Sequence, residues 1–452
     1  MLFLERTNSY LSGAVLPLVL ISVGIYLAFK FRAFYIIHPI KTMKELKGAG
    51  SGDGVSPFKA LSIALAGTLG VGNISGVATA ICAGGAGAVF WMWASAFAAM
   101  SVKYAEVSLA VKYRRKKDGA LQGGAFLYMR EGLRGKIGNR PAALIASFFA
   151  VMLVLNSVLT GNIVQVNAAS SVFEGIPPVV CGIAIALTVL AVTAGGAARI
   201  GDFTVRVIPF LTVLYSALSV FVIVTNADRA PEVFSRIVSG AFDFRAAAGG
   251  VVGFTFSRAV RFGVTRGIFS NEAGCGTAPT AHAQTNTDSP HRQGCLGIFE
   301  VFCDTIIMCT MTAFVILLAD VPGYDGIPLS MRSYGEFCGR AGAYAVGISV
   351  IIFALATVIC QEFYGMEALS FLGGGRGARR AYLAVSFFAT LAGSVMSPGL
   401  VWQFADLEIA VMTVVNTLAV FILSDEVPFP RSSKRADVNK LKLIFKWKYP
   451  ES

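Results

Sequence analysis

Charged side chains are scarce in this sequence of 452 residues: Asp, Glu, Lys and Arg together make up 14%, whereas 55% of the residues are hydrophobic. Soluble globular proteins average about 25% charged residues, so the composition argues against a water-soluble enzyme. Histidine is also rare, with three residues, and the eight cysteines form no CxxC pair. The sequence therefore predicts neither a disulfide scaffold nor a metal cluster, and no His or Cys has an apparent nucleophile–base partner.

Long uncharged runs occupy most of the chain instead. A helix that crosses the hydrocarbon core of a bilayer needs about 20 apolar residues. The residues before the first run lack the basic region and cleavage site of a signal peptide, so we expect a retained span there. We predict eleven spans within these segments: 10–29, 60–102 (two helices divided at Gly84–Gly87), 141–173, 175–198, 207–227, 246–257, 293–319, 341–361 and 381–424 (two helices divided near Pro398). A short loop with Arg199 and Asp202 is expected between the fifth and sixth spans.

The net charge of +12 has a topological explanation. With the N-terminus outside, 31 of the 38 Lys and Arg residues fall in inside segments, which is a strong positive-inside bias. We therefore predict a multi-pass plasma-membrane protein (a bacterial inner membrane) with a cytoplasmic C-terminus, and no nucleic-acid partner. The expected parts are an N-terminal helix and linker (1–54), a core of ten helices (55–425) and a basic tail (426–452). That tail either lies on the anionic inner leaflet or is solvated.

A glycine-rich polar stretch interrupts the second span at Ala66–Gly76. Non-helical backbone is tolerated in a membrane only where it is buried in protein or lines a cavity. Transporters place substrate and ion sites at such breaks. We expect a broken helix here, whose freed N–H groups could bind a carboxylate and whose carbonyls could bind Na⁺. The alternative is a small-residue packing face between helices.

The seventh span, 246–257, is weak and is followed by Arg258, Arg261 and Arg266. We interpret it as a second broken helix, interrupted by glycines between Gly249 and Gly267. Two interrupted spans five apart predict an inverted 5+5 repeat with one extra N-terminal helix. The fold class is therefore an all-α integral membrane protein of about eleven helices, with broken first and sixth core helices.

Further polar residues lie inside otherwise apolar spans. Gln165 lies in the fourth span, and Thr357 and Gln361 share one face of the ninth together with Ala354. They are candidates for ligand and cation contacts, or for hydrogen bonds between helices. The acids in or near spans are expected mostly to form structural pairs, with proton coupling as the alternative for two of them, Glu300 and Asp304. The expected pairings are Glu106 with Lys103, and Asp406 and Glu408 with the arginine-rich break.

The stretches AGTLGVGNISG (66–76), GGAARIGDFTVRVIP (195–209) and GVTRGIFSNEAGCGTAPTAH (263–282) carry a family resemblance. The sequence resembles the alanine or glycine:cation symporters over residues 55–425. The resemblance implies a leucine-transporter-like fold, no cofactor, and Na⁺-driven uptake of a small neutral amino acid. It implies substrate contacts at Gly70, Gly72, Asn73, Gln165 and Thr357, with the seventh span near Phe254–Gly267 as the remaining wall. The cation would bind at Gly70, Val71, Ala354 and Thr357.

The sequence departs from the family at Gln361, where a tryptophan is common. Glutamine leaves the expected side-chain pocket less bulky and more polar, so a larger substrate such as glutamine becomes an alternative to alanine or glycine. Two further hypotheses remain open. A proton-coupled amino-acid symporter would use Glu300 or Asp304, and a channel or passive facilitator would show no concentrative uptake.

Overall fold

The computed structural model describes residues 6–8, 10–45, 53–117, 119–173, 175–194, 196–242 and 251–429. These segments are almost entirely helical. Their only sheet is the small hairpin of β1 (Arg115–Lys117) and β2 (Ala120–Gln122). The helices are α2 (Leu16–Lys30), α3 (Phe34–Ile37), α4 (Pro39–Lys44), α5 (Pro57–Thr68), α6 (Ser75–Gly84), α7 (Gly87–Tyr113), α8 (Ala125–Gly132), α9 (Arg134–Ile137), α10 (Asn139–Val158), α11 (Gln165–Ser170), α12 (Pro178–Thr193), α13 (Gly196–Thr225), α14 (Ala230–Ala241), α15 (Val251–Asn271), α16 (Ala278–His282), α17 (Pro290–Val301), α18 (Thr310–Ala319), α19 (Gly326–Phe371), α20 (Arg376–Val395) and α21 (Pro398–Ile422).

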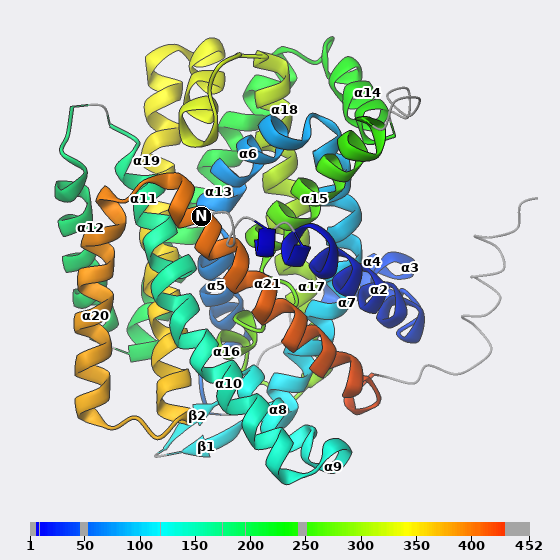
Figure 1. Ribbon diagram of the computed structural model, residues 1–452, viewed down its shortest axis with the longest axis vertical. Coiled ribbons are helices and arrows are strands. Elements are labelled where there is room, and N and C mark those ends of the chain that lie inside the picture. The colour runs from blue at the N-terminus through cyan, green and yellow to red at the C-terminus, as the bar shows by residue number, and fades with distance from the viewer. Residues whose placement is uncertain are drawn as a thin grey trace, which may run out of the picture.

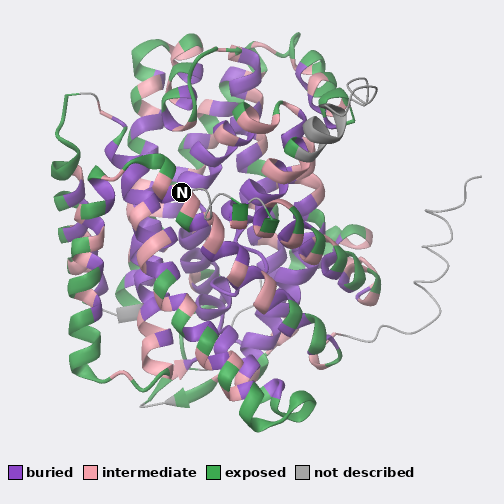
Figure 2. Ribbon diagram, viewed as in Figure 1, coloured by how far each residue is buried: buried purple, intermediate pink, exposed green. Residues whose placement is uncertain are grey.

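The short helices α5 and α6 lie in the interior of the bundle (Figure 1). They pack against α13, α15, α16 and α19. Buried residues concentrate around this centre, whereas α12 and α20, which pack on each other at one edge, expose much of their surface (Figure 2). The hairpin, α8 and α9 lie at one end of the molecule and α14 at the opposite end (Figure 1).

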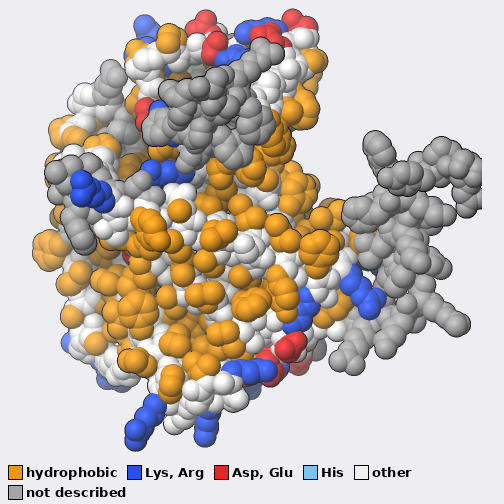
Figure 3. Space-filling view, turned by 45° about the vertical axis from the view of Figure 1, so that its right-hand side comes forward, with side chains coloured by type: hydrophobic (Ala, Val, Ile, Leu, Met, Phe, Trp, Pro, Cys, Tyr) orange, Lys and Arg blue, Asp and Glu red, His pale blue; other side chains and the backbone are white. Residues whose placement is uncertain are grey.

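The outer surface is apolar where a membrane protein meets lipid. Figure 3 shows hydrophobic side chains over the middle of one face, with charged side chains gathered toward the two ends. Leu144, Leu187, Val213 and Phe388 are all more than half exposed, which is costly in water and favourable in hydrocarbon. Among the described residues, six helices are long and apolar enough to cross a membrane, and the bent pair α5–α6 would make a seventh. The chain is therefore a multi-pass membrane protein.

The predicted break in the second span is confirmed. Ser56 caps α5 by accepting a hydrogen bond from the backbone N–H of Lys59 at 3.2 Å, and Pro57 occupies the first turn, where no N–H is needed. The helix ends at Thr68, and Gly70 is extended. One turn of 3₁₀-helix, Val71–Asn73, leads into α6, and the two helices are bent by 58°. The division of residues 60–102 between Gly84 and Gly87 is also confirmed.

The predicted position of the seventh span is wrong. Helix α15 runs unbroken from Val251 to Asn271, so it contains Arg258, Arg261 and Arg266, which were expected to follow the span. Its glycines provide close packing rather than a break: a Cβ at Gly263 would lie 2.7 Å from the Cβ of Trp91, and one at Gly267 would lie 2.9 Å from Ser95 Oγ, both on α7. Gly249 and Gly250 lie outside the described residues.

Two other helices begin earlier than predicted. Helix α13 starts at Gly196, so the expected loop with Arg199 and Asp202 is helical, and Asp202 pairs with Lys59 at 2.6 Å. Helix α19 starts at Gly326, and its non-helical Gly339, with φ of +59°, divides a leading segment from the predicted ninth span. Polar residues in the first turns of α13 and α19 predict a later start for both helices than the structure has. Helix–helix packing, and not hydropathy alone, decides where each helix begins.

Candidate functional site

The α5–α6 break brings four predicted site residues together. The hydroxyl of Thr357, on α19, donates to the carbonyl of Ala66 at 3.0 Å. The side-chain oxygen of Gln165, at the start of α11, accepts from the N–H of Val71 at 3.1 Å. A Cβ at Gly70 would lie 2.7 Å from Thr357 Oγ1 and 2.8 Å from Gln165 Oε1. Glycine is therefore required where these two side chains approach the broken backbone.

The same region gathers oxygen atoms that suit a hard monovalent cation. Leu69 and Gly70 leave the helical conformation, so carbonyls near them are not all used within a helix. The Thr357 hydroxyl already contacts this segment, and Ala354 lies one turn earlier on α19, fully buried. Carbonyl and hydroxyl oxygens are the ligands that such cations prefer.

On the other side of the break, Gly72 and Asn73 face different partners. A Cβ at Gly72 would lie 3.1 Å from the Cα of Ser270, so the chain approaches the end of α15 closely. Asn73 Nδ2 donates to Asp304 Oδ1 at 2.7 Å and to the Asp304 carbonyl at 3.1 Å. Among the described residues, the buried Oδ1 of Asn73 has no hydrogen-bond partner. That oxygen is available to a ligand.

Asp304, which the sequence suggested only as an alternative proton-coupling residue, is the centre of a cluster beside the predicted substrate and cation contacts. It lies in the π-helical segment Phe302–Cys309 between α17 and α18 and is fully buried. Its carboxylate also accepts from Ser270 at 2.9 Å and from Thr305 at 2.8 Å. A π-helical turn is uncommon and is frequently found at functional sites. The one available sequence signal was an acid within an apolar span.

The second break lies after α15, at Glu272–Thr277. Glu272, Gly274 and Gly276 have φ values of +49°, +81° and +79°. This left-handed backbone conformation favours glycine, which occupies two of the three positions. Asn271 Oδ1 accepts from the N–H of Ala273 at 2.9 Å, which satisfies the broken backbone. The predicted interruption at Phe254–Gly267 is therefore wrong; the chain leaves the helical conformation after Asn271, about one turn beyond Gly267.

Gln361 joins this second break rather than the first. Its Nε2 donates to Glu272 Oε1 at 2.7 Å, and its Oε1 accepts from Asn156 at 3.0 Å. The side chain is fully buried, and a Cβ at Gly161 would lie 2.6 Å from its Cγ. Thr277 donates to the other carboxylate oxygen of Glu272 at 2.5 Å. A larger side chain at position 361 would have to displace this network.

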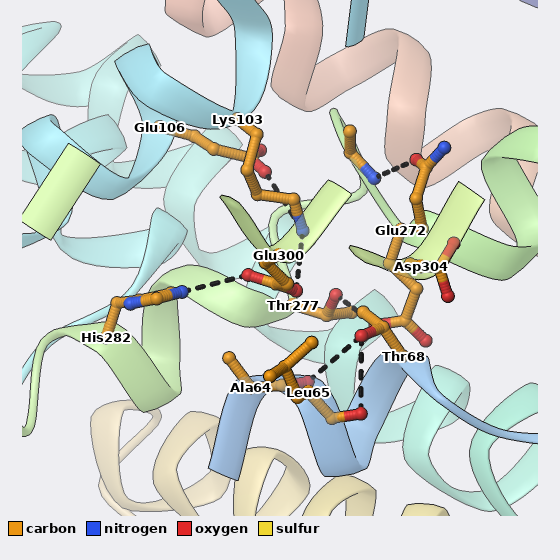
Figure 4. Close-up of polar contacts among 12 residues, drawn as sticks. Ala64, Leu65, Thr68, Lys103, Glu106, Glu272, Thr277, His282, Glu300 and Asp304 are labelled. Atoms are coloured by element: carbon orange, nitrogen blue, oxygen red, sulfur yellow. Dashed lines mark hydrogen bonds and ion pairs between the residues drawn. The ribbon is translucent and has the colours of Figure 1, made fainter. Parts of the chain in front are cut away.

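A buried ion-pair network lies beside the second break (Figure 4). Lys103 Nζ is 3.2 Å from Glu300 and 3.8 Å from Glu106, and all three side chains are fully buried. The other oxygen of Glu300 is 2.9 Å from His282 Nε2 on α16. Glu106 accepts from Asn416 on α21 at 2.8 Å. The predicted structural pairing of Glu106 with Lys103 is confirmed, and the network ties α7, α16, α17 and α21 together.

Asp406 and Glu408, the two remaining acids for which the sequence predicted a partner, differ. Arg266 forms a bidentate pair with Asp406, at 2.7 and 3.1 Å, and its guanidinium lies over the ring of Trp402. This confirms the predicted pairing of Asp406 with the arginines. Glu408 accepts instead from Thr160 at 2.9 Å, and its other oxygen has no hydrogen-bond partner among the described residues. The expected pairing of Glu408 with an arginine is wrong.

The site therefore offers amide, hydroxyl, carbonyl and carboxylate groups at two helix breaks near the middle of the bundle. Such groups can bind and orient a small zwitterion and a cation without any covalent step.

Two kinds of comparison identify relatives. The fold resembles that of MhsT, a transporter of the leucine-transporter fold solved in complex with L-phenylalanine, with a TM-score of 0.55 over 82% of this chain and 89% of MhsT at 16% identity. An uncharacterized transporter of Haemophilus influenzae is 38% identical over 92% of both chains. The sodium/alanine symporter AgcS of Methanococcus maripaludis is 34% identical over 94% of both chains.

The chain is also 34% identical to GlnT of Bacillus subtilis, named as a probable sodium/glutamine symporter, over 93% of this chain and 87% of GlnT. A sequence model of the sodium:alanine symporter family matches residues 2–430. These relatives are transporters and not enzymes. The chain therefore belongs to the sodium:alanine symporter family.

Proposed function

We propose that this protein is a sodium-coupled symporter that imports a small neutral amino acid by alternating access. The observation that carries the proposal is the α5–α6 break, where Thr357 meets the Ala66 carbonyl and Gln165 meets the Val71 N–H. Relatives named as sodium/alanine and sodium/glutamine symporters support the same function.

In this proposal Na⁺ binds at the carbonyls of Gly70 and Val71, the Ala354 carbonyl and the Thr357 hydroxyl. The substrate carboxylate meets the N–H groups of Gly72 and Asn73, and Gln165 and Thr357 orient its polar ends. The unpartnered Asn73 oxygen is suited to accept from an ammonium group. No cofactor takes part. Na⁺ stabilises the outward-open state. Coupling requires that Na⁺ bind the outward-open and inward-open states with different affinities.

Gln361 selects substrate in this proposal. Alanine or glycine is the expected class, and glutamine is the alternative because position 361 lacks the bulky tryptophan that is common in the family. The link between Gln361 and Glu272 makes this wall polar, which favours a substrate with a polar side chain.

We also propose eleven membrane crossings in an inverted 5+5 arrangement. Helices α7, α12, α15 and α20 add four crossings to the seven that are long and apolar enough. The first core helix of each half is then interrupted, at α5–α6 and at α15–α16. The N-terminus lies outside and the C-terminus in the cytoplasm of a bacterial inner membrane. The basic elements β1 and α9 lie at the end opposite α14, which is consistent with this orientation (Figure 1).

The test is uptake of labelled alanine, glycine and glutamine into proteoliposomes. We expect accumulation of at least one of them when Na⁺ is high outside, with stimulation by an inside-negative potential because each charge moved inward gains about 2.3 kcal/mol per 100 mV. Absence of Na⁺-dependent uptake of all three would overturn the proposal.

A proton-coupled symporter is the second candidate. It is favoured by the buried Asp304 cluster and by the Glu300–His282 pair, since carboxylates and histidines relay protons in transporters. Uptake driven by a pH gradient in Na⁺-free buffer would select this candidate. Uptake that never exceeds equilibration would select a passive facilitator.

A further inference from the structure

Two adjoining hollows lie between the α3–α4 segment and helices α7 and α17. The first has a volume of about 290 Å³ and is lined by apolar side chains together with the polar and charged side chains of Arg32, His38, Lys41 and Glu45; it is called the polar hollow below. The second, of about 220 Å³, is lined almost entirely by apolar side chains, among them Met43, Phe97, Met100, Ile298 and Phe302. Thr42 and Cys295 line both, so the two hollows adjoin each other.

The first hollow carries excess positive charge. Arg32 and Lys41 contribute two cations, while the one acid, Glu45, pairs with Arg292 at 3.5 Å. Lys41 is exposed and has no carboxylate partner among the residues that the structure describes. An anionic group of small size is therefore the complementary ligand.

The two hollows lie at different depths along α17. The polar hollow contacts His291 and Cys295, in the first turns after Pro290, whereas the apolar hollow extends from Cys295 to Phe302. Seven helical residues correspond to about 10 Å. In the proposed orientation α17 begins at the cytoplasmic face, so polarity falls with increasing depth into the bilayer. A phospholipid of the inner leaflet has the same order of headgroup and acyl chain.

Backbone conformation and hydrogen bonds fix the α3–α4 segment beside the two hollows. Arg32 and Ala33 both adopt left-handed φ, of +58° and +44°, a conformation that is uncommon for these residue types and persists only where packing imposes it. Tyr35 anchors the segment by bonding to the Phe97 carbonyl at 2.8 Å and to Ser101 Oγ at 3.0 Å. Ile36, Ile40 and Met43 are more than half exposed, as expected of residues that face lipid.

We propose that these hollows form a binding site for one anionic phospholipid of the inner leaflet. Its headgroup phosphate binds at Arg32 and Lys41, and one acyl chain occupies the apolar hollow beside Met43 and Phe302. Basic pockets at the cytoplasmic ends of membrane helices recognise such headgroups. The apolar lining of the second hollow favours an acyl chain over the polypeptide that follows Phe429, another residue of the polar hollow.

Native mass spectrometry of the purified full-length protein tests the charge recognition. Phosphatidylglycerol and phosphatidylcholine with the same acyl chains are added in competition. We expect phosphatidylglycerol to bind preferentially, and Lys41→Glu to reduce that preference roughly tenfold. Lys136→Glu, on the exposed helix α9, is the matched control and should leave it unchanged. Equal binding of both lipids, or an equal loss in both variants, would overturn the proposal.

Photo-crosslinking tests the position. A phosphatidylglycerol with a photoreactive group in one acyl chain should label peptides that contain Met43 or Phe302, and Lys41→Glu should abolish this label. Labelling confined to other lipid-facing helices would contradict the site. So would absence of label at both peptides, which is expected if the chain's own residues after Phe429 fill the hollows.

Discussion

Asn73 donates from one amide nitrogen to both the carboxylate and the backbone carbonyl of Asp304, at 2.7 and 3.1 Å. Asp304 lies in a π-helical turn, where the backbone hydrogen-bond pattern differs from that of an α-helix. The α5–α6 break and the α17–α18 helix are thus fastened at a single point. A substitution of Asp304 is therefore expected to alter the conformation of the α5–α6 break.

Asp304→Asn should lower Na⁺-driven amino-acid uptake by about 10- to 100-fold. The substitution preserves size but removes the charge that accepts from Asn73, Ser270 and Thr305, and a hydrogen bond to a charged group contributes about 1.5–3 kcal/mol. Initial uptake rates in proteoliposomes at several Na⁺ concentrations would measure it. Asp425→Asn, which breaks an exposed pair with Lys30, is the control and should retain the activity. Uptake by Asp304→Asn within twofold of that of the unchanged protein would contradict a role of Asp304 in transport.

Gly70→Ala should reduce transport by roughly tenfold or more. The new methyl group would lie within 3 Å of Thr357 Oγ1 and Gln165 Oε1, and displacements of about 1 Å at a site can cost 100-fold in rate. Gly76→Ala, six residues further along, is a matched control because a Cβ there meets no atom within 4 Å. Uptake and thermal stability of the two variants should be compared in parallel. Equal uptake by both would indicate that Gly70 is dispensable.

The two breaks show how far the sequence could be interpreted. At Ala66–Gly76 the glycines themselves mark the break, because Gly70 stands where two polar side chains approach the backbone. In α15 glycine is needed for a different reason: Gly263 and Gly267 allow close packing on α7. The real second break needs left-handed backbone at Gly274 and Gly276. Composition does not distinguish a glycine required by φ from one required by a neighbouring helix.

The sequence named Asp304 as an intramembrane acid but could not predict its contacts, for another reason. Ser270 and Asp304 are 34 residues apart, and no periodicity connects residues on different helices. Gln165 and Thr357 were identified because each is polar in an apolar span and because the family resemblance implies them, whereas their contacts with Val71 and Ala66 follow from tertiary packing. The expected pairing of Asp406 with the arginine-rich break did not say which arginine is the partner; that it is Arg266, 140 residues away, follows from tertiary packing.

Thr357→Val should raise the Na⁺ concentration needed for half-maximal uptake by about tenfold, while Thr357→Ser should restore it. Valine has the same shape as threonine but lacks the hydroxyl that contacts the Ala66 carbonyl, and one lost buried hydrogen bond costs about 1–3 kcal/mol. The Na⁺ dependence of uptake at saturating substrate is the measurement. A structural role alone would lower the maximal rate or stability of the valine variant without shifting the Na⁺ dependence.

Lys103→Met should destabilise the folded protein by about 3–5 kcal/mol. It leaves the buried carboxylates of Glu300 and Glu106 without their cation, and removing one partner of a buried pair carries this cost. Lys30→Met is the control: its pair with Asp425 is shorter, at 2.7 Å, but the Asp425 side chain is 77% exposed and stays solvated when the lysine is lost, and pairs that water reaches contribute about 0–1 kcal/mol. Thermal unfolding of both variants in detergent should show the larger drop in midpoint for Lys103→Met. Adding Glu300→Gln should recover part of it, because the uncompensated charge is then removed. A drop equal to that of Lys30→Met would mean that burial does not set the strength of the Lys103 pairs.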